Sequence, residues 1–288
     1  MGSDGATTTL VDVSQRPGYV TATTIWSVAA DYDGGDVYWS QTSGGGAGGV
    51  TAIHRRESTT GNFTSLDVGP FSPQVYGLAY HQAADQLYLG QGANIFRLNQ
   101  DLSLPGQVFS GGDEIIGLAI DEVGGNLFFT DAGADTINRL SLNGGGALTQ
   151  LATSSQPRGI AYDPIGNDIY WIDRDLDDIF RISADGSDNG VSELFLDVPF
   201  SSTNHSLTID NGRLYWAESS ASNRGIWSLN LDGTGLAQAY TTDAAVFGVA
   251  SIAAVPEPSS LVALALGAVG LGCRRLRRGK ASPPVAAL

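Results

Sequence analysis

The chain has 288 residues, of which 42% are hydrophobic and 38 are glycine, and it carries a formal net charge of −15 at pH 7. Its apolar content excludes global disorder, and its single cysteine, Cys273, excludes an intrachain disulfide and a cysteine-based metal site. Residues 1–254 contain ten arginines, no lysine and 29 carboxylates, a net charge of −19, whereas residues 255–288 have a net charge of +4. Because an acidic surface repels phosphate, this body is not expected to bind nucleic acid.

From residue 27 onward the chain repeats one short pattern. Each unit begins with a small residue and an apolar run, and it reaches an aromatic pair after a turn. Successive units start 40 to 50 residues apart. The starts are residues 27–31 (SVAAD), 77–81 (GLAYH), 117–121 (GLAID), 159–163 (GIAYD), 206–210 (SLTID) and, without a second half, 248–251 (GVAS).

The rest of each unit predicts three further strands. Turns such as residues 123–126 (VGGN) and 164–167 (PIGN) join the first run to a β-branched and aromatic second run, which is typical of a hairpin. Third runs follow at residues 95–98, 137–140, 179–182 and 226–229, and weaker fourth runs at residues 107–109, 149–151, 193–195 and 238–240. Four short strands at this period predict the blades of an all-β propeller, and no segment of the body shows helical periodicity.

The aromatic pairs carry a resemblance to a known family. Three units have a Tyr-Trp pair in the second run, at Tyr38-Trp39, Tyr170-Trp171 and Tyr215-Trp216. Over about residues 20–252 the units resemble the YWTD repeats of low-density-lipoprotein-receptor class B propellers, although units two and three have Tyr88-Leu89 and Phe128-Phe129. The resemblance implies six blades. We expect an incomplete last blade, begun by residues 248–252 and closed by residues 10–13 and 19–25; an incomplete or five-bladed ring is the alternative.

Residues 255–280 differ from the body in composition. Pro256 and Pro258 end β structure, because proline fixes φ and removes a hydrogen-bond donor. The uncharged residues 259–273 would form a helix of roughly 22 Å, short against a hydrocarbon core of about 30 Å. A basic cluster follows, consisting of Arg274, Arg275, Arg277 and Arg278. This cluster predicts a cytoplasmic C-terminus and a propeller outside the cell.

The order of Pro-Glu-Pro, apolar span and arginine cluster resembles the PEP-CTERM sorting domain. The resemblance implies that Pro256, Glu257 and Pro258 are recognised by exosortase, a membrane transpeptidase-like enzyme of Gram-negative bacteria that make exopolysaccharide, and that the tail is then removed. We therefore expect a propeller at residues 1–254, a sorting signal with a transient transmembrane helix at residues 255–280 and a disordered tail at residues 281–288. Because the first ten residues lack a signal-peptide pattern, we expect that the true start lies upstream.

The body contains none of the common motifs that would indicate catalysis. It has no Gly-x-Ser-x-Gly nucleophile elbow, no His-Glu-x-x-His zinc motif and no glycine-rich phosphate loop. His54 is expected at the surface. His81 replaces the turn residue of the inner run and is expected to be structural.

Aspartates occur at two kinds of position. Those that end the inner runs are expected to make side-chain bonds within turns, and they are Asp31, Asp121, Asp163 and Asp210. Asp173, Asp175 and Asp177 alternate along another turn, and alternate carboxylates suit calcium, but the spacing does not match an EF-hand loop. We regard these three as weak candidates for a calcium site, and a solvated loop is the alternative.

The residues that precede the inner runs are expected to gather near the axis on one face of the propeller. They are Tyr76, Ile116, Arg158, His205 and Phe247. Tyr76, Arg158, His205 and Phe247 are the ligand-binding candidates, and channel packing is the alternative role for each.

These features predict an exported, non-catalytic propeller that binds a protein or a polysaccharide in the bacterial envelope or extracellular matrix. No cofactor is expected unless calcium binds. The first alternative is a propeller lactonase or hydrolase with a divalent cation at the channel mouth, which the residues preceding the inner runs disfavour. The second is a structural spacer in an extracellular matrix.

Overall fold

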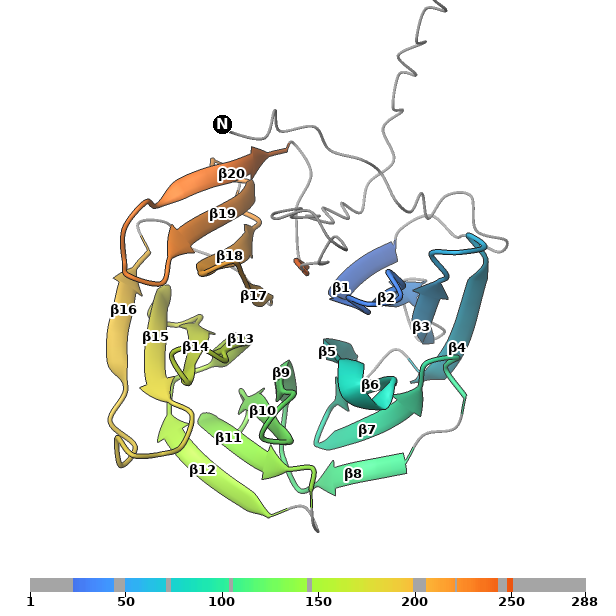
Figure 1. Ribbon diagram of the computed structural model, residues 1–288, viewed down its shortest axis with the longest axis horizontal. Helices are drawn as coiled ribbons and strands as arrows, with labels where there is room; N and C mark the ends of the chain where they lie inside the picture. The colour runs from blue at the N-terminus through green and yellow to red at the C-terminus, as the bar shows by residue number, and fades with distance from the viewer. Residues whose placement is uncertain are drawn as a thin grey trace, which may run out of the picture.

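The structure, a computed structural model, describes residues 23–43, 50–70, 74–103, 106–143, 147–198, 206–220, 222–242 and 248–250. Within these ranges, five four-stranded antiparallel sheets surround a central axis (Figure 1). In each sheet the strands follow chain order, with the first strand nearest the axis and the fourth at the rim. The prediction of an all-β propeller is therefore confirmed.

The five blades have the following strands. Blade one contains β1 (Thr23–Ala30), β2 (Val37–Ser43), β3 (Val50–Arg56) and β4 (Phe63–Pro70). Blade two contains β5 (Val75–His81), β6 (Gln86–Gln91), β7 (Asn94–Asn99) and β8 (Gly106–Ser110). Blade three contains β9 (Ile115–Asp121), β10 (Asn126–Asp131), β11 (Thr136–Ser141) and β12 (Leu148–Thr153). Blade four contains β13 (Pro157–Asp163), β14 (Asp168–Asp173), β15 (Asp178–Ser183) and β16 (Glu193–Asp197), and blade five contains β17 (Leu207–Asp210), β18 (Arg213–Glu218), β19 (Gly225–Asn230) and β20 (Ala237–Thr241).

The described residues form five blades and do not support the predicted sixth, incomplete blade. Residues 19–25 were expected to help close a sixth blade, but Thr23 and Ile25 belong to β1, where they pair with Ser43 and Gln41 of β2. This part of the prediction is wrong because β2 is long enough to pair with these β-branched residues and thereby extends the inner strand of blade one. Residues 10–13 and 19–22, the C-terminal helix and the boundaries at residues 254 and 280 lie outside the described ranges.

Helical structure is nearly absent from the described ranges. There, one three-residue 3₁₀ turn, η2 (Gln82–Ala84), follows β5. No helix in the described part of the chain is both long and apolar enough to span a membrane.

Neighbouring blades bury hydrophobic clusters between their faces. Successive side chains of a strand point to opposite faces, so the two residues of an aromatic pair contact different neighbours. In blade four, Tyr170 belongs to a cluster with Trp216 of blade five, whereas Trp171 belongs to a cluster with Phe128 of blade three. In blades two, three and four the pair therefore attaches the blade on both sides. Short strands of four to eight residues need such packing, because small isolated β structures are only marginally stable.

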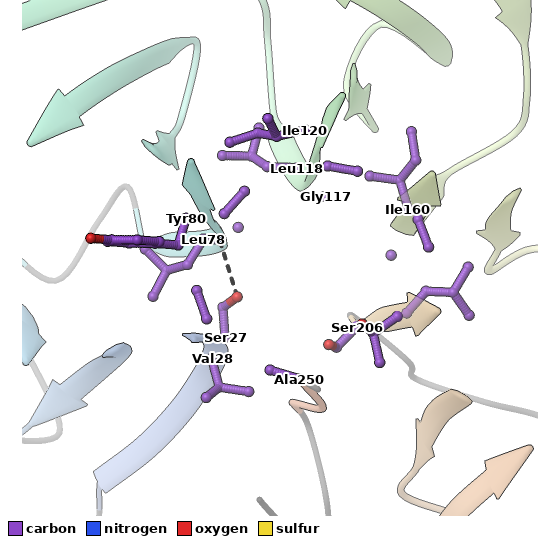
Figure 2. Close-up of a pocket in the computed structure, with 18 of the residues that line it drawn as sticks. Ser27, Val28, Leu78, Tyr80, Gly117, Leu118, Ile120, Ile160, Ser206 and Ala250 are labelled. Atoms are coloured by element: carbon purple, nitrogen blue, oxygen red, sulfur yellow. Dashed lines mark hydrogen bonds between the residues drawn. The ribbon is translucent and has the colours of Figure 1, made fainter. Parts of the chain in front are cut away.

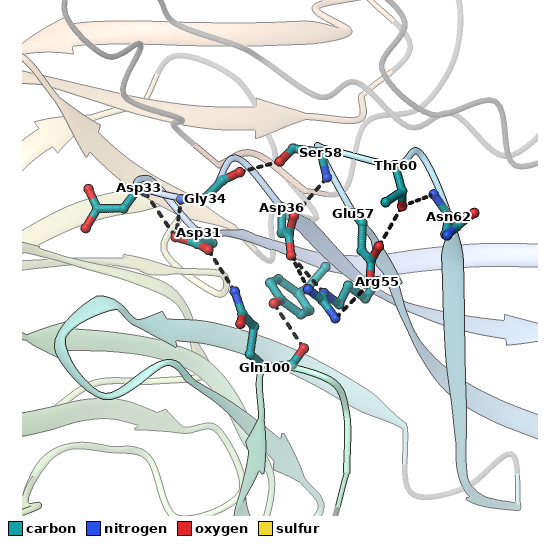
Figure 3. A network of polar contacts seen from close by, with 11 residues as sticks. Asp31, Asp33, Gly34, Asp36, Arg55, Glu57, Ser58, Thr60, Asn62 and Gln100 are labelled. Carbon is teal, nitrogen blue, oxygen red and sulfur yellow. Dashed lines mark hydrogen bonds and ion pairs between the residues drawn. The ribbon is translucent and has the colours of Figure 1, made fainter.

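The turn aspartates act as predicted in three blades. Asp31 Oδ1 accepts hydrogen bonds from the backbone N–H groups of Asp33 and Gly34, at 3.0 and 2.9 Å (Figure 3). Asp121 and Asp163 accept equivalent bonds in blades three and four. In blade five the turn is shorter, and Asp210 instead accepts a bond from Asn211 Nδ2 at 3.1 Å.

The same end of blade one carries a polar network that reaches blade two (Figure 3). Arg55 Nη2 lies 2.6 Å from Asp36 Oδ2. Gln100 of blade two donates to Asp31 Oδ2 at 3.2 Å, and the Gln100 carbonyl accepts a bond from the Tyr38 hydroxyl at 3.2 Å. Because every one of these groups bonds within the protein, the network is a structural link between the two blades.

The two predictions for histidines had different outcomes. His54 is only 1% exposed, with Nδ1 2.8 Å from Ser65 Oγ and its ring 5.2 Å from that of Trp39, so its predicted surface position is wrong. The physical reason is that β3 continues through His54 and turns its side chain to a buried face. His81 is structural as predicted, with Nε2 3.3 Å from Glu122 Oε2 of blade three.

Candidate functional site

The five inner strands enclose a channel along the axis (Figure 2). Its cavity has a volume of about 180 Å³, which is smaller than the roughly 300–1,000 Å³ typical of a pocket for a drug-sized ligand. The wall includes the apolar side chains of Val28, Leu78, Leu118, Ile160 and Leu207, together with polar backbone and side-chain groups. A channel of this volume can hold one small chemical group of a ligand but not an entire drug-sized ligand.

Glycines let the inner strands approach one another closely. A Cβ atom on Gly77 would lie 2.4 Å from the carbonyl oxygen of Ile116 in the next blade, and a Cβ on Gly117 would lie 2.4 Å from that of Arg158. Gly159 is equally confined, because its Cβ would lie 2.8 Å from the Leu207 nitrogen. We call Gly77, Gly117 and Gly159 the ring glycines, since no larger residue fits these contacts without backbone movement.

Serines take the equivalent position in blades one and five and bond to the next inner segment. Ser27 Oγ accepts a hydrogen bond from the Leu78 N–H at 3.1 Å (Figure 2). Ser206 Oγ lies 3.0 Å from both the backbone nitrogen and the carbonyl oxygen of Val249. A Cβ atom on Gly248 would lie 3.1 Å from Val28 Cγ1. The sixth repeat start therefore lies at the axis between blades five and one, although it is not a strand.

In blades one to four, the inner strand has a β-bulge at the ring glycine or serine. In blade two, Val75 pairs with Gln91 and Gly77 pairs with Gly90, which leaves Tyr76 as an extra residue. A bulge bends its strand and re-aims the side chain of the extra residue. It therefore gives Tyr76 an orientation that regular strand alternation would not.

The same irregularity occurs in β1, β9 and β13. We call the four residues that directly precede Ser27 and the ring glycines the mouth residues. They are Trp26, Tyr76, Ile116 and Arg158. Tyr76 and Ile116 line the channel cavity. The sequence argument missed Trp26, although its position directly before Ser27 in the repeat was the signal that identifies it.

The candidate Tyr76 lies in an aromatic and polar setting. Its ring centroid is 5.1 Å from that of Trp26, and the two rings are nearly perpendicular. Its hydroxyl donates a hydrogen bond to Gln74 Oε1. Burial raises the pKa of the phenol, and the Glu114 carboxylate raises it further. Of the other candidates, Arg158 is described below, and His205 and Phe247 lie outside the described residues.

Arg158 is a buried cation with few partners. Its side chain is nearly covered, since the residue is 5% exposed. Nη2 donates to Gln156 Oε1 at 3.1 Å, and the buried Nε has no hydrogen-bond partner. Within the described ranges no carboxylate forms an ion pair with it. Burial lowers the pKa of the guanidinium and the charge of Arg174 adds to this, whereas the Glu114 carboxylate, Tyr76 and Asp175 oppose it.

The three weak calcium candidates occupy a turn on blade four. Asp173 is 1% exposed and accepts bonds from Ser154 Oγ at 2.6 Å and from the N–H groups of Asp175 and Leu176 at 3.1 and 3.2 Å. Asp177 has a left-handed φ of 59°. In the part of the chain that the structure describes, no three His, Cys, Asp or Glu side chains are grouped to hold a metal ion. A calcium site at these residues stays a prediction.

Comparisons with known proteins agree on the fold and on the tail. Residues 254–278 match the family described as the PEP-CTERM protein-sorting motif. No curated protein matches the chain by sequence. The chain is similar to a chain in the crystal structure of a nidogen/laminin complex, with a TM-score of 0.64 and 19% identity over 78% of this chain and 84% of that one. It is also similar to a gluconolactonase from Xanthomonas campestris, with a TM-score of 0.62 and 17% identity over 81% of each chain.

Both likenesses to solved structures show the fold alone, because the identities are low. The match at residues 254–278 confirms the predicted sorting signal and implies export and processing by exosortase. The chain is therefore a β-propeller that carries a PEP-CTERM sorting motif at its C-terminal end.

Proposed function

We propose that this protein is a non-catalytic binding propeller of a Gram-negative cell surface or extracellular matrix, which exosortase releases from a transient C-terminal membrane anchor. Its ligand, a protein or a polysaccharide, binds at the channel mouth. The observation that carries the proposal is the repeated bulge, which re-aims Trp26, Tyr76 and Arg158 on one face of the ring. Aromatic and arginine side chains are the residue types that most often dominate binding surfaces.

We also propose that the propeller has six blades, with the sixth repeat start between blades five and one. Residues 248–250 support this, since they contact both Ser206 and Val28 at the axis. Trp39 and His54 support it as well. They are 0% and 1% exposed on the face of blade one that points away from blade two, where no described blade packs.

The lactonase alternative requires a divalent cation, and the described residues fit one poorly. Hard divalent cations take several oxygen ligands, commonly carboxylates. Glu122 is the one carboxylate that lines the described channel, and its oxygens already accept bonds from the N–H groups of Gln82 and Ala83. The donor set of the described channel therefore favours binding over cation-assisted hydrolysis.

Expression in an exosortase-bearing host tests the sorting part. We expect a surface or secreted product that ends near Pro256, together with a longer precursor in cells that lack exosortase, as intact mass spectrometry would show. A Pro256→Ala, Pro258→Ala variant should keep its tail and serves as the matched control. Persistence of the full tail on the wild-type protein at the envelope would contradict the proposal.

Hydrolysis of D-glucono-1,5-lactone tests the non-catalytic part. The full-length protein in millimolar calcium should not accelerate hydrolysis above the buffer rate. An acceleration that chelation removes would overturn this part and favour the lactonase.

A further inference from the structure

Arg158 is held in place by its backbone while its charged group is left largely unpaired. The Thr130 hydroxyl donates to the Arg158 carbonyl at 2.6 Å, and Gly117 lies against the same carbonyl. The guanidinium nevertheless has one described hydrogen-bond acceptor, Gln156 Oε1, for five N–H donors. The fold thus fixes the position of this cation without neutralising it.

Such an arrangement costs stability in the free protein. A buried charge is unfavourable unless it is paired and hydrogen-bonded, and the Nε–H group of Arg158 is both buried and unpartnered. Planar guanidinium groups bind carboxylates through two parallel hydrogen bonds. A ligand carboxylate would therefore satisfy donors that the protein itself leaves unused.

The surroundings of Arg158 favour a sugar acid as the carrier of that carboxylate. Trp26 and Tyr76 place two aromatic rings at the same position of neighbouring inner strands, and the Glu114 carboxylate is close enough to influence the pKa values of both Tyr76 and Arg158. That carboxylate can accept hydrogen bonds from hydroxyls. The small volume of the channel excludes a large ligand from the axis. The net charge of −19 on residues 1–254 repels a densely charged polyanion at long range, so an isolated carboxylate is favoured over a run of them.

We infer that Arg158 anchors a binding site at the channel mouth for the carboxylate of a terminal uronic acid unit of a polysaccharide. This inference rests on the proposed function and specifies its ligand. The guanidinium binds the carboxylate, Gln156 orients the guanidinium, and Trp26 and Tyr76 contact the sugar ring.

Calorimetric titration of the full-length protein with D-glucuronate tests this site. We expect saturable binding, at least tenfold tighter than that of D-glucose, which has the same ring without the carboxylate. Arg158→Met retains the apolar stem and should abolish the preference. Its melting temperature should equal or exceed that of the wild type, because it removes a buried unpaired charge. Arg158→Lys keeps the charge but not the planar fork and should weaken binding about tenfold.

The controls separate this inference from its rivals. Arg97→Met removes an exposed arginine of blade two and should bind glucuronate as the wild type does. Absence of saturable glucuronate binding, or unchanged binding by Arg158→Lys and Arg158→Met, would overturn the inference. Equal or tighter binding of N-acetyl-aspartate amide would overturn it in favour of an acidic peptide. Failure of the proposed function is distinguishable, because it appears as lactone hydrolysis or as an unprocessed tail rather than in these titrations.

Discussion

Two adjacent positions of the inner strands differ in the residue types that they accommodate. The ring glycines and the two serines at the equivalent position are uniformly small, and each lies against the backbone or side chains of the next inner segment. The mouth residue directly before Ser27 and before each ring glycine is an indole, a phenol, a branched alkyl group or a guanidinium. The bulge separates the two roles, because it lets one residue serve ring closure while its neighbour is free to vary in chemistry.

The first position serves the packing of the inner strands, and the second is the one at which we propose that the ligand binds. Small residues at the axis bring the inner strands together, and any added atom there meets a fixed backbone. The mouth residues carry no such constraint, so four different chemistries occupy one structural position. Substitutions at the two positions should therefore have unlike effects.

The largest expected effect comes from filling a ring glycine. Gly117→Val would place Cβ 2.4 Å from the Arg158 carbonyl oxygen and 2.9 Å from Thr130 Oγ1, so the inner strands of blades three and four must separate. We expect a loss of about 3 kcal/mol or more in the free energy of unfolding, measured by urea denaturation. Gly106→Ala is the matched control, because its Cβ would meet nothing closer than 3.6 Å and the change should be near neutral. Similar losses for both variants would contradict the close approach.

An intermediate effect is expected from removing a serine of the ring. Ser206→Ala loses the hydroxyl bonds to the nitrogen and carbonyl oxygen of Val249, at a cost of about 1–2 kcal/mol. Hydrogen exchange at the Val249 amide should accelerate, whereas exchange at Leu78, which bonds to Ser27, should not. Unchanged protection of Val249 would mean that residues 248–250 are held at the axis by other contacts.

The smallest effect concerns the aspartate at the other end of the inner strand in blade five. Burial raises the pKa of Asp210, and its bond from Asn211 only partly offsets this. The folded state therefore binds the proton more tightly than the unfolded state, so the contribution of Asp210 to stability is present at low pH and is lost as pH rises through the raised pKa. Asp210→Asn should stabilise the protein by about 0.5 kcal/mol at pH 7 and have no effect near pH 3. Urea denaturation at both pH values checks this, and a larger gain at pH 3 would reverse the assigned sign.

Much of the architecture could be predicted from the sequence, because each repeat contains the same turn, strand and packing residues. The glycine turns, the aromatic pairs and the turn aspartates each recur, and all three act in the structure as their residue types indicate. Asp210 departs because a two-residue turn has different donors. The prediction for Thr23 and Ile25 failed because β-branched residues suit any strand, and only pairing partners decide which sheet receives them.

The positions of the candidate site residues could be predicted from the sequence, but their burial and charge pairing could not. Tyr76 and Arg158 follow from the repeat, whereas the burial of Arg158 depends on packing from several blades that no local pattern displays. The burial of His54 could not be predicted either. A histidine beside two arginines is typical of a surface, but in β3 its side chain lies on the buried face of the strand, opposite Trp39. Ion pairing likewise depends on residues that are distant in the sequence, so the sequence could not show that the Arg158 guanidinium has no ion-pair partner among the described residues.

The position of residues 248–250 has a mechanical consequence. The sorting-motif match begins at residue 254, and the four residues after residue 250 can span at most about 14 Å. In the proposed membrane-anchored precursor, a pull on the tail would be applied near the axis of the ring rather than at its rim. The first described contacts to bear that tension would be the two bonds between Ser206 and Val249, so the load would reach the inner strands before any outer one.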